Sequence, residues 1–183
     1  MKKFFFHFSI FIFVFILINI ISAFLWGPIK STNLLNLNKK DYYSENILEV
    51  IGLKDSEQHH FFNEMWIERK FKYVQFAEHL EAETKNQKYV NVTSEFGRLV
   101  ENNLNCNIRI FVYGSSQVFG YNAKDHQTIP SYLKKILDNK LNDKNYCVYN
   151  FGSASYYSTQ ENILFINHFL NQKILPNDYA VFI

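Results

Sequence analysis

The fold of this chain is decided by one central stretch, Ile108-Arg109-Ile110-Phe111-Val112-Tyr113-Gly114-Ser115-Ser116-Gln117-Val118-Phe119-Gly120. Its first six residues are apolar or aromatic apart from Arg109, which is typical of a strand buried on both faces of a parallel sheet. Gly114 then allows a sharp turn, because it has no Cβ to clash. Ligands of open parallel sheets bind just past the carboxyl ends of the strands. A serine at this place is therefore a candidate nucleophile.

Further strands and helices are expected to alternate after this stretch. Thr128, followed by Ile129-Pro130, predicts the start of a helix. Its apolar positions are Leu133, Ile136, Leu137 and Leu141. A strand is predicted at 146–150, and the capping-box pattern of Ser158 and Glu161 predicts a second helix. The buried face of that helix is predicted at Ile163, Ile166, Phe169 and Leu170. A third strand at 179–183 completes an order that predicts right-handed crossovers and a parallel sheet.

Charge and motifs exclude several classes of function. The 19 Lys and Arg and 17 Asp and Glu give a net charge of +2 without a basic run, so no nucleic-acid partner is expected. Neither a Gly-x-Gly-x-x-Gly nor a Gly-Lys-Ser/Thr motif occurs, which argues against a nucleotide cofactor. His59 and His60, with Glu64 one turn on, allow a metal interpretation, but no further ligand has convincing spacing. We expect a solvated helix start there, and neither a metal nor a cofactor.

The amino-terminal segment is strongly apolar. Lys2 and Lys3 precede an uncharged run from Phe4 to Trp26, and a bilayer span needs about 20 apolar residues. The sequence therefore predicts a transmembrane signal anchor at 1–27, with a cytoplasmic amino terminus and membrane contact through residues 4–26. A cleaved signal peptide ending near Ile21-Ser22-Ala23 is the alternative. In either case we expect an exported protein, and the anchor implies a single-pass protein of the bacterial inner membrane facing the periplasm.

Composition divides the rest of the chain into a polar linker, a mixed lead-in or cap region, and the start of a truncated α/β domain. These parts span 28–40, 41–103 and 104–183. In the lead-in region, the aromatic spacing from Phe61 to Leu80 predicts one or two helices. Glu78, His79 and Glu81 are then expected on a polar helix face.

Two cysteines lie close to the predicted strands. Cys106 precedes the central strand and Cys147 lies at the start of the next one. If these strands are parallel neighbours, their amino ends are adjacent and the two sulfurs can meet. An exported chain lies where disulfides persist. A disulfide and two unpaired buried cysteines remain equal alternatives.

From about Ile108 onward, the chain resembles the SGNH or GDSL-type hydrolases, and more narrowly exported bacterial members with Gly-Gly-Ser-x-x-x-Gly after a strand. The matching run is Gly114 to Gly120, which implies that Ser116 is the nucleophile and that its own amide lies in the oxyanion hole. Asn150-Phe151-Gly152 matches the second block of the family and implies that Gly152 is the second oxyanion donor. The resemblance covers about half of the chain. It implies a three-layer α/β/α, flavodoxin-like fold with a parallel sheet, incomplete here and preceded by one transmembrane helix.

Two departures from the family pattern qualify this resemblance. Ser115 stands where the broad family often has Asp, although the narrower subgroup often has Gly there. The third block, Gly-x-Asn-Asp, and the Asp-x-x-His that supplies the base are both absent up to Ile183. We therefore expect an amino-terminal fragment, inactive or nearly so by itself. His126 lies in a loop after the nucleophile and is expected to be a solvated loop residue rather than the base.

The resemblance implies a membrane-anchored serine esterase, acyl hydrolase or acyltransferase of the cell envelope. Ser116 would attack an ester-linked acyl group on a small molecule, glycan or lipid, and Gly152 would help to bind the oxyanion. No cofactor is implied. The alternative is a non-catalytic envelope module that keeps the same fold for binding or assembly.

Overall fold

The computed structural model describes residues 7, 8, 10–22, 43, 45–84, 86–101, 103, 105–141 and 145–183. The chain divides into two compact units, Met1–Tyr42 and Tyr43–Ile183. In the first unit, residues 10–22 are helical. None of the helices in the described ranges combines the length and the apolar character that crossing a membrane requires. This finding contradicts the predicted signal anchor at 1–27 and the predicted single-pass location in the inner membrane. Parts of that segment, 1–6, 9 and 23–27, and the predicted linker at 28–40 lie outside the described residues.

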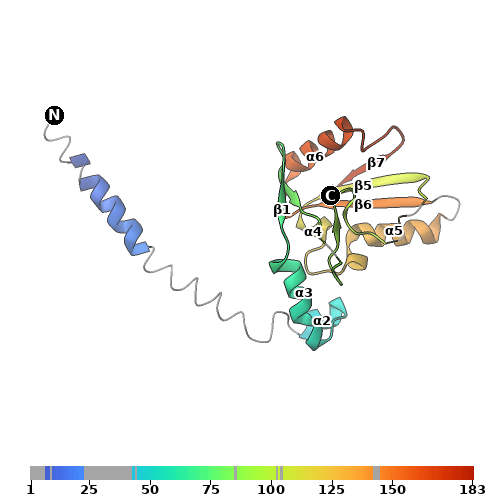
Figure 1. The fold of residues 1–183 in the computed structure, drawn as a ribbon, viewed down its shortest axis with the longest axis horizontal. Coiled ribbons are helices and arrows are strands. Elements are labelled where there is room, and N and C mark those ends of the chain that lie inside the picture. The colour runs from blue at the N-terminus through green and yellow to red at the C-terminus, as the bar shows by residue number, and fades with distance from the viewer. Residues whose placement is uncertain are drawn as a thin grey trace. The chain divides into compact units, whose positions relative to one another are not determined.

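A five-stranded sheet forms the centre of the second unit (Figure 1). Its strands are β3 (Val92–Thr93), β4 (Gly97–Arg98), β5 (Ile108–Gly114), β6 (Tyr146–Gly152) and β7 (Tyr179–Phe182). Their spatial order is β3-β4-β6-β5-β7. β4, β6, β5 and β7 are parallel neighbours, whereas β3 runs antiparallel to β4. The predicted fold class is therefore wrong in two respects: the sheet is mixed, and no membrane-spanning helix is found among the described residues.

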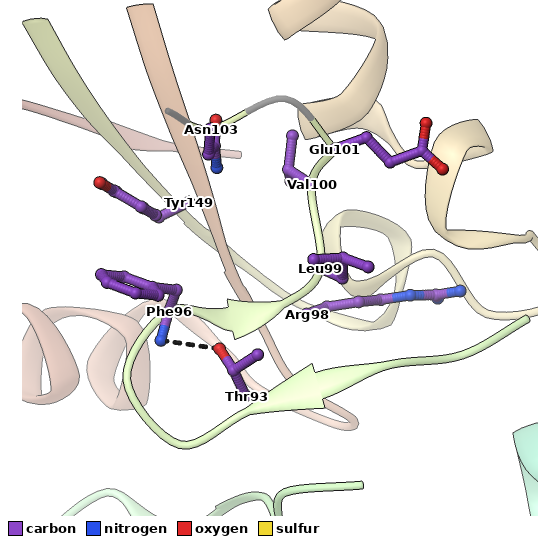
Figure 2. Close-up of a pocket in the computed structure, with 8 residues that line it drawn as sticks. All are labelled: Thr93, Phe96, Arg98, Leu99, Val100, Glu101, Asn103 and Tyr149. Carbon is purple, nitrogen blue, oxygen red and sulfur yellow. Dashed lines mark hydrogen bonds between the residues drawn. The ribbon is translucent and has the colours of Figure 1, made fainter. Parts of the chain in front are cut away.

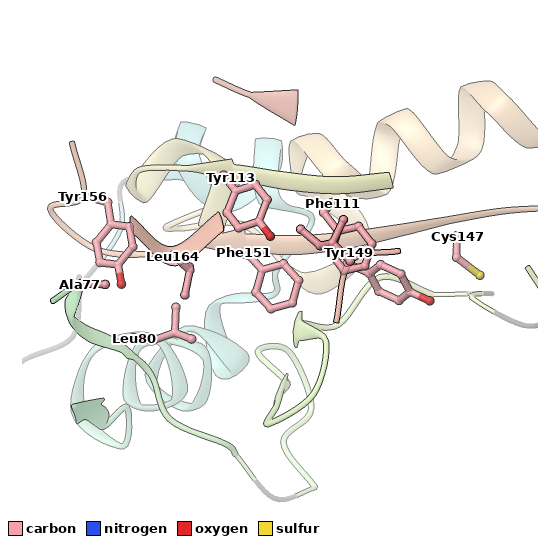
Figure 3. Close-up of a cluster of buried hydrophobic side chains, with 10 residues drawn as sticks. Ala77, Leu80, Phe111, Tyr113, Cys147, Tyr149, Phe151, Tyr156 and Leu164 are labelled. Carbon is pink, nitrogen blue, oxygen red and sulfur yellow. The ribbon is translucent and has the colours of Figure 1, made fainter. Parts of the chain in front are cut away.

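The two faces of β5 and β6 are covered by different helices. Phe111, Tyr113 and Phe151 point to one face, where Leu164 of α6 (Ser158–Leu170) packs on them. Figure 3 shows the aromatic rings of this cluster along the strands, with Cys147 toward one end. The residues between them on the strands, Ile110, Val112 and Val148, point to the opposite face, and Leu133 and Leu137 of α5 (Ile129–Lys140) cover them. Successive side chains of each strand thus point to opposite faces of the sheet, and both faces are buried, as expected for a central parallel strand.

The start of α5 agrees with the sequence, but its predicted apolar face does so only at Leu133 and Leu137. Thr128 caps the helix, and its Oγ1 accepts a hydrogen bond from the Ser131 N–H at 3.3 Å. Ile136 and Leu141 are exposed, while Lys134 is buried and pairs with Asp138 one turn on. Hydrophobic spacing alone does not fix the helix rotation, because the fit of the helix to the sheet decides which side is covered.

The predicted face of α6 is wrong for the same reason. The helix begins at Ser158, but its N-cap is Tyr157, whose N–H donates to Gln160 Oε1 at 3.4 Å. Of the residues predicted to be buried, Ile163 is half-buried, and three are exposed: Ile166, Phe169 and Leu170. Apolar residues occur around most of this helix, so its sequence does not specify one face.

The lead-in region contains short helices and a separate hairpin. Its elements are α2 (Glu45–Ile51), the 3-10 turn η2 (Asp55–Glu57), α3 (Gln58–Phe62), the π-helical turn η3 (Asn63–Ile67), β1 (Phe71–Val74) and β2 (Glu78–Glu81). β1 and β2 pair antiparallel in a two-stranded sheet. The helix predicted to continue to Leu80 is therefore wrong. Along β1, exposed Phe71 and Tyr73 alternate with half-buried Lys72 and Val74, which is the period of a strand.

The amino ends of β5 and β6 are joined by a disulfide between Cys106 and Cys147, whose Cα atoms are 5.4 Å apart. The strand register explains the bridge, since Ile108 lies opposite Tyr146 and Arg109 opposite Cys147. Of the two alternatives left by the sequence, the structure has the disulfide. It lies at the opposite end of the two strands from Ser116.

Candidate active site

Ser116 lies directly after the carboxyl end of β5. The strand ends at Gly114, Ser115 keeps an extended backbone, and Ser116 begins the short helix α4 (Ser116–Phe119). Gly120 ends this helix with φ of 85°, a left-handed conformation that favours glycine. Ser116 is half-buried, and its hydroxyl has no hydrogen-bond partner among the described residues.

Gly152 lies at the same edge of the sheet. It is the last residue of β6 and is in register with Gly114 of β5. A Cβ at Gly152 would clash with the backbone nitrogen of Phe119, so this contact between β6 and α4 requires a glycine. The next residue, Ser153, donates its N–H to the Gly114 carbonyl at 3.1 Å. Its hydroxyl is fully buried and has no partner in the described part of the chain.

Asn150 connects Gly152 to α4. Its Nδ2 donates to the Val118 carbonyl at 2.9 Å, and its Oδ1 accepts the Gly152 N–H at 3.0 Å. The Asn150 side chain is completely buried. The amide that the resemblance assigns to the oxyanion hole is therefore already bonded within the protein. Gly152 can donate to a substrate oxygen only if this hydrogen bond is exchanged.

Arg98 holds the far end of α4. Its Nη1 donates to the carbonyls of Phe119 and Gly120 at 2.8 and 2.6 Å, and its Nη2 donates to the Ala123 carbonyl at 2.5 Å. Its Nε donates to Asp125 Oδ1 at 3.0 Å, and both side chains are buried. Burial raises the pKa of Asp125, and the charge of Arg98 opposes this shift. One guanidinium thus satisfies carbonyls that the end of a short helix leaves free.

β2 places Glu81 and His79 beside the loop after β6, and Arg69, just before β1, pairs with Glu81. Arg69 binds Glu81 through Nε at 3.0 Å and Nη2 at 2.8 Å, and Glu81 Oε1 accepts the Ala154 N–H at 3.2 Å. The His79 Nε2 lies 2.8 Å from the Ala154 carbonyl oxygen. Burial raises the pKa of Glu81, while Arg69 lowers it. The polar helix face predicted for these residues is wrong, and no sequence motif marks this ion pair.

Glu64 is also more than a solvated helix residue. Only 1% of it is exposed, and its carboxylate accepts the N–H groups of Lys88, Tyr89 and Val90 at 2.8, 2.7 and 3.1 Å. His60 Nε2 lies 2.9 Å from Glu64 Oε1. In the described ranges, no cluster of three or more His, Cys, Asp or Glu side chains is arranged to hold a metal ion.

No base contacts Ser116 among the described residues. His126 lies on η4 (Asp125–Gln127), where its carbonyl accepts from Lys135 Nζ at 3.1 Å, and its side chain lines a cavity with Glu101. That cavity does not include Ser116. His79 is the histidine whose ring bonds to the loop after Gly152, and sequence reasoning had not linked it to this edge.

A cavity of about 330 Å³ lies beside the other edge of β6 (Figure 2). Phe96 stacks on Tyr149 in its wall, with ring centroids 4.9 Å apart. Asn103 pairs with the edge of β6, donating to the Val148 carbonyl at 2.6 Å and accepting its N–H at 3.0 Å. Neither Ser116 nor Gly152 lines this cavity, so it is separate from the predicted catalytic residues.

Comparison with known proteins assigns no family. No protein-family model matches the chain, and no curated protein matches it. The resemblance to SGNH hydrolases therefore stays a prediction, carried by the short motifs around Ser116 and Gly152.

Proposed function

We propose that this chain belongs to a serine esterase or acyltransferase of the SGNH type, with Ser116 as the nucleophile. The observation that supports this most directly is the Ser116 hydroxyl, which is half-buried at the carboxyl end of a central parallel strand. It has no hydrogen-bond partner among the described residues. Ligand sites of such sheets lie at this edge. The buried Thr128 hydroxyl, by contrast, is used within the protein, where its Oγ1 accepts the Ser131 N–H.

In the proposed reaction, Ser116 Oγ attacks the carbonyl carbon of an ester and loses its proton to a base. The alcohol leaves with a proton, and an acyl group remains bound to Ser116. Water or an acceptor hydroxyl then removes the acyl group and restores the serine. The Ser116 amide supports the oxyanion, and Gly152 joins it when Asn150 Oδ1 releases the Gly152 N–H. The acyl group and its carrier, a small molecule, glycan or lipid, follow from the resemblance alone.

A fluorophosphonate probe tests the nucleophile. We expect intact-protein mass spectrometry to show one phosphonyl adduct on the wild-type chain and on Ser115→Ala, and none on Ser116→Ala. Labelling should be slow, because an unactivated serine is a weak nucleophile. Ser115→Ala is a matched control, since it removes a neighbouring half-buried hydroxyl in the same turn. Adducts of equal yield on wild type and Ser116→Ala would exclude Ser116 as the reactive residue.

One observation favours a second candidate, a non-catalytic binding module. The Gly152 N–H is bonded to Asn150, and no described side chain contacts the Ser116 hydroxyl as a base. If the module is non-catalytic, the phosphonate should modify none of the three chains.

A further inference from the structure

A second cavity, of about 260 Å³, lies between the β1–β2 hairpin and α6. Pockets for drug-sized ligands are roughly 300–1,000 Å³, so this one admits a small molecule. None of the proposed catalytic residues lines it. β1 and α6 lie next to each other in Figure 1.

This cavity has polar side chains on both of its sides, beside the apolar Val74 and Leu80. Leu164, Asn167 and His168 of α6 and its C-cap residue Asn171 line the cavity, and their spacing places them on one side of the helix. The hairpin contributes Lys72, which is half-buried on the inner side of β1. Leu164 is buried against the sheet, and His168 directs its ring toward Tyr113 and Phe151 of the sheet. Asn167 donates to the hairpin, at the Gln75 carbonyl.

The charges around the cavity are of one sign. Lys72 and Lys173 both line it, and no Asp or Glu does. Neither lysine forms an ion pair with a described residue. Lys173 Nζ lies 4.4 Å from the centre of the Phe151 ring. Burial, and to a lesser extent the charge of Lys72, lowers the pKa of Lys173 to about 8, and the exposed Glu95 opposes this shift. Two ammonium groups that repel each other in a half-buried cavity are stabilised by an anion between them.

The asparagines supply acceptors and donors, because each Nδ2 uses one of its two N–H groups within the protein. Asn167 Nδ2 donates to the Gln75 carbonyl at 3.1 Å, and Asn171 Nδ2 donates to the Asn167 carbonyl at 2.8 Å. Their Oδ1 atoms and remaining N–H groups suit ligand hydroxyl groups, whereas the lysines suit an oxyanion. We propose that this cavity binds a small hydroxylated organic anion, whose phosphate or carboxylate group lies between Lys72 and Lys173. The inference stands apart from the proposed esterase function and does not depend on Ser116.

Isothermal titration calorimetry with glucose 6-phosphate, gluconate, inorganic phosphate and glucose tests this site on the whole chain. We expect glucose 6-phosphate or gluconate to bind, and glucose to bind at least 10-fold more weakly. Preference for glucose 6-phosphate assigns a phosphate group to the lysine pair, and preference for gluconate assigns a carboxylate. Absence of binding by both anions, or equal binding of glucose, would show that the proposal is wrong.

Matched lysine variants locate the site. We expect Lys72→Gln and Lys173→Gln each to weaken binding about 10-fold, because each removes one positive charge that attracts the anion. Lys135→Gln is the control, since this exposed lysine on α5 lies outside the cavity. Glu95→Gln should strengthen binding by removing a competing charge. Lys72 lies on a half-exposed strand, so its variant keeps the test valid if Lys173→Gln unfolds. A loss with Lys135→Gln equal to that with Lys72→Gln would reject the site.

Discussion

The lead-in region and the α/β unit satisfy their buried polar groups by different means. In the α/β unit, β5 pairs along its length with β6 and also with β7, and both faces of these strands are covered by apolar side chains. The lead-in region instead uses single buried charges. Glu64 accepts three backbone N–H groups of this region, and Arg98 donates to three carbonyls at the end of α4 and in the loop after it, where the lead-in region packs on the α/β unit.

The difference shows how irregular backbone can be buried. A strand ladder satisfies many backbone groups with any residues of suitable shape, whereas a loop needs a side chain of the right charge at one position. Such a charge is costly to bury, so its contacts must be complete. The lead-in region should therefore be sensitive to single charge substitutions, and the α/β unit to its packing and its covalent link.

Loss of Arg98 should have the largest effect on stability. Arg98→Met leaves the Asp125 carboxylate buried without its ion-pair partner and three carbonyls without a donor. Breaking a buried pair from one side costs about 3–5 kcal/mol, so we expect urea unfolding to show a loss of about 4 kcal/mol.

Two further variants show whether this loss arises from the pair. Arg98→Met combined with Asp125→Asn should recover part of the stability, because the double variant leaves no unpaired charge. Lys135→Met, at an exposed lysine, should change the unfolding free energy by less than about 0.5 kcal/mol. A loss below about 1 kcal/mol for Arg98→Met would contradict the role assigned to this guanidinium.

Removal of the disulfide should have the next largest effect. Cys106 and Cys147 are separated by 41 positions, and a loop of this size corresponds to about 4 kcal/mol in the chain-entropy model. Measured values are often smaller, so we expect Cys106→Ser combined with Cys147→Ser to lose about 3 kcal/mol. Labelling of Ser116 by the fluorophosphonate should persist in the double variant, because the bridge lies at the far end of β5 and β6. Equal stability of the oxidised and reduced wild-type chain would contradict this prediction.

The sequence predicts the parts of the fold that follow a regular pattern. The strands at Ile108–Gly114, Tyr146–Gly152 and Tyr179–Phe182, and the Thr128 cap, could be read from apolar runs and turn residues. The antiparallel strand β3 could not, because two residues carry no periodicity. The exposed sides of α5 and α6 were missed in part, since apolar residues occur around most of α6 and the packing partner decides the rotation of both helices.

The candidate site was predicted only in part. The position of Ser116 and Gly152 at one edge of the sheet was predicted, because glycines mark the ends of their strands. Their catalytic role stays a prediction. The hydrogen bond from Gly152 to Asn150 depends on a side-chain rotamer, which the sequence does not specify. The approach of His79 and Glu81 to Ala154 depends on the β1–β2 hairpin, where the aromatic spacing had predicted a helix. Contacts between residues far apart in the sequence leave no local pattern, so only the folded structure brings them together.

The smallest of the expected effects concerns His168, a titratable group within the apolar layer of the α/β unit. Its Nδ1 lies 2.8 Å from the Tyr113 hydroxyl, and burial, with the charges of Lys173 and Lys72, lowers its pKa to about 3. The folded chain thus keeps His168 neutral, whereas the unfolded chain binds a proton below a pKa of about 6.5. The part of the unfolding free energy that depends on neutral His168 is complete above that pH and is lost progressively as the pH falls toward 3. Between pH 7 and pH 5 this predicts a loss of about 2 kcal/mol in unfolding free energy.

Urea unfolding of wild type and His168→Gln at both pH values isolates the contribution of His168 to the unfolding free energy. The raised pKa values of Glu81 and Asp125 act in the opposite direction, because a folded carboxyl with a raised pKa gains relative stability as the pH falls. Both chains share that contribution, so it cancels in the difference between them. His168→Gln should be less stable at pH 7 but should lose about 2 kcal/mol less than wild type on going to pH 5. Parallel losses in the two chains would mean that His168 takes up its proton in the folded protein, and that the apolar layer tolerates a charge as the lead-in region does.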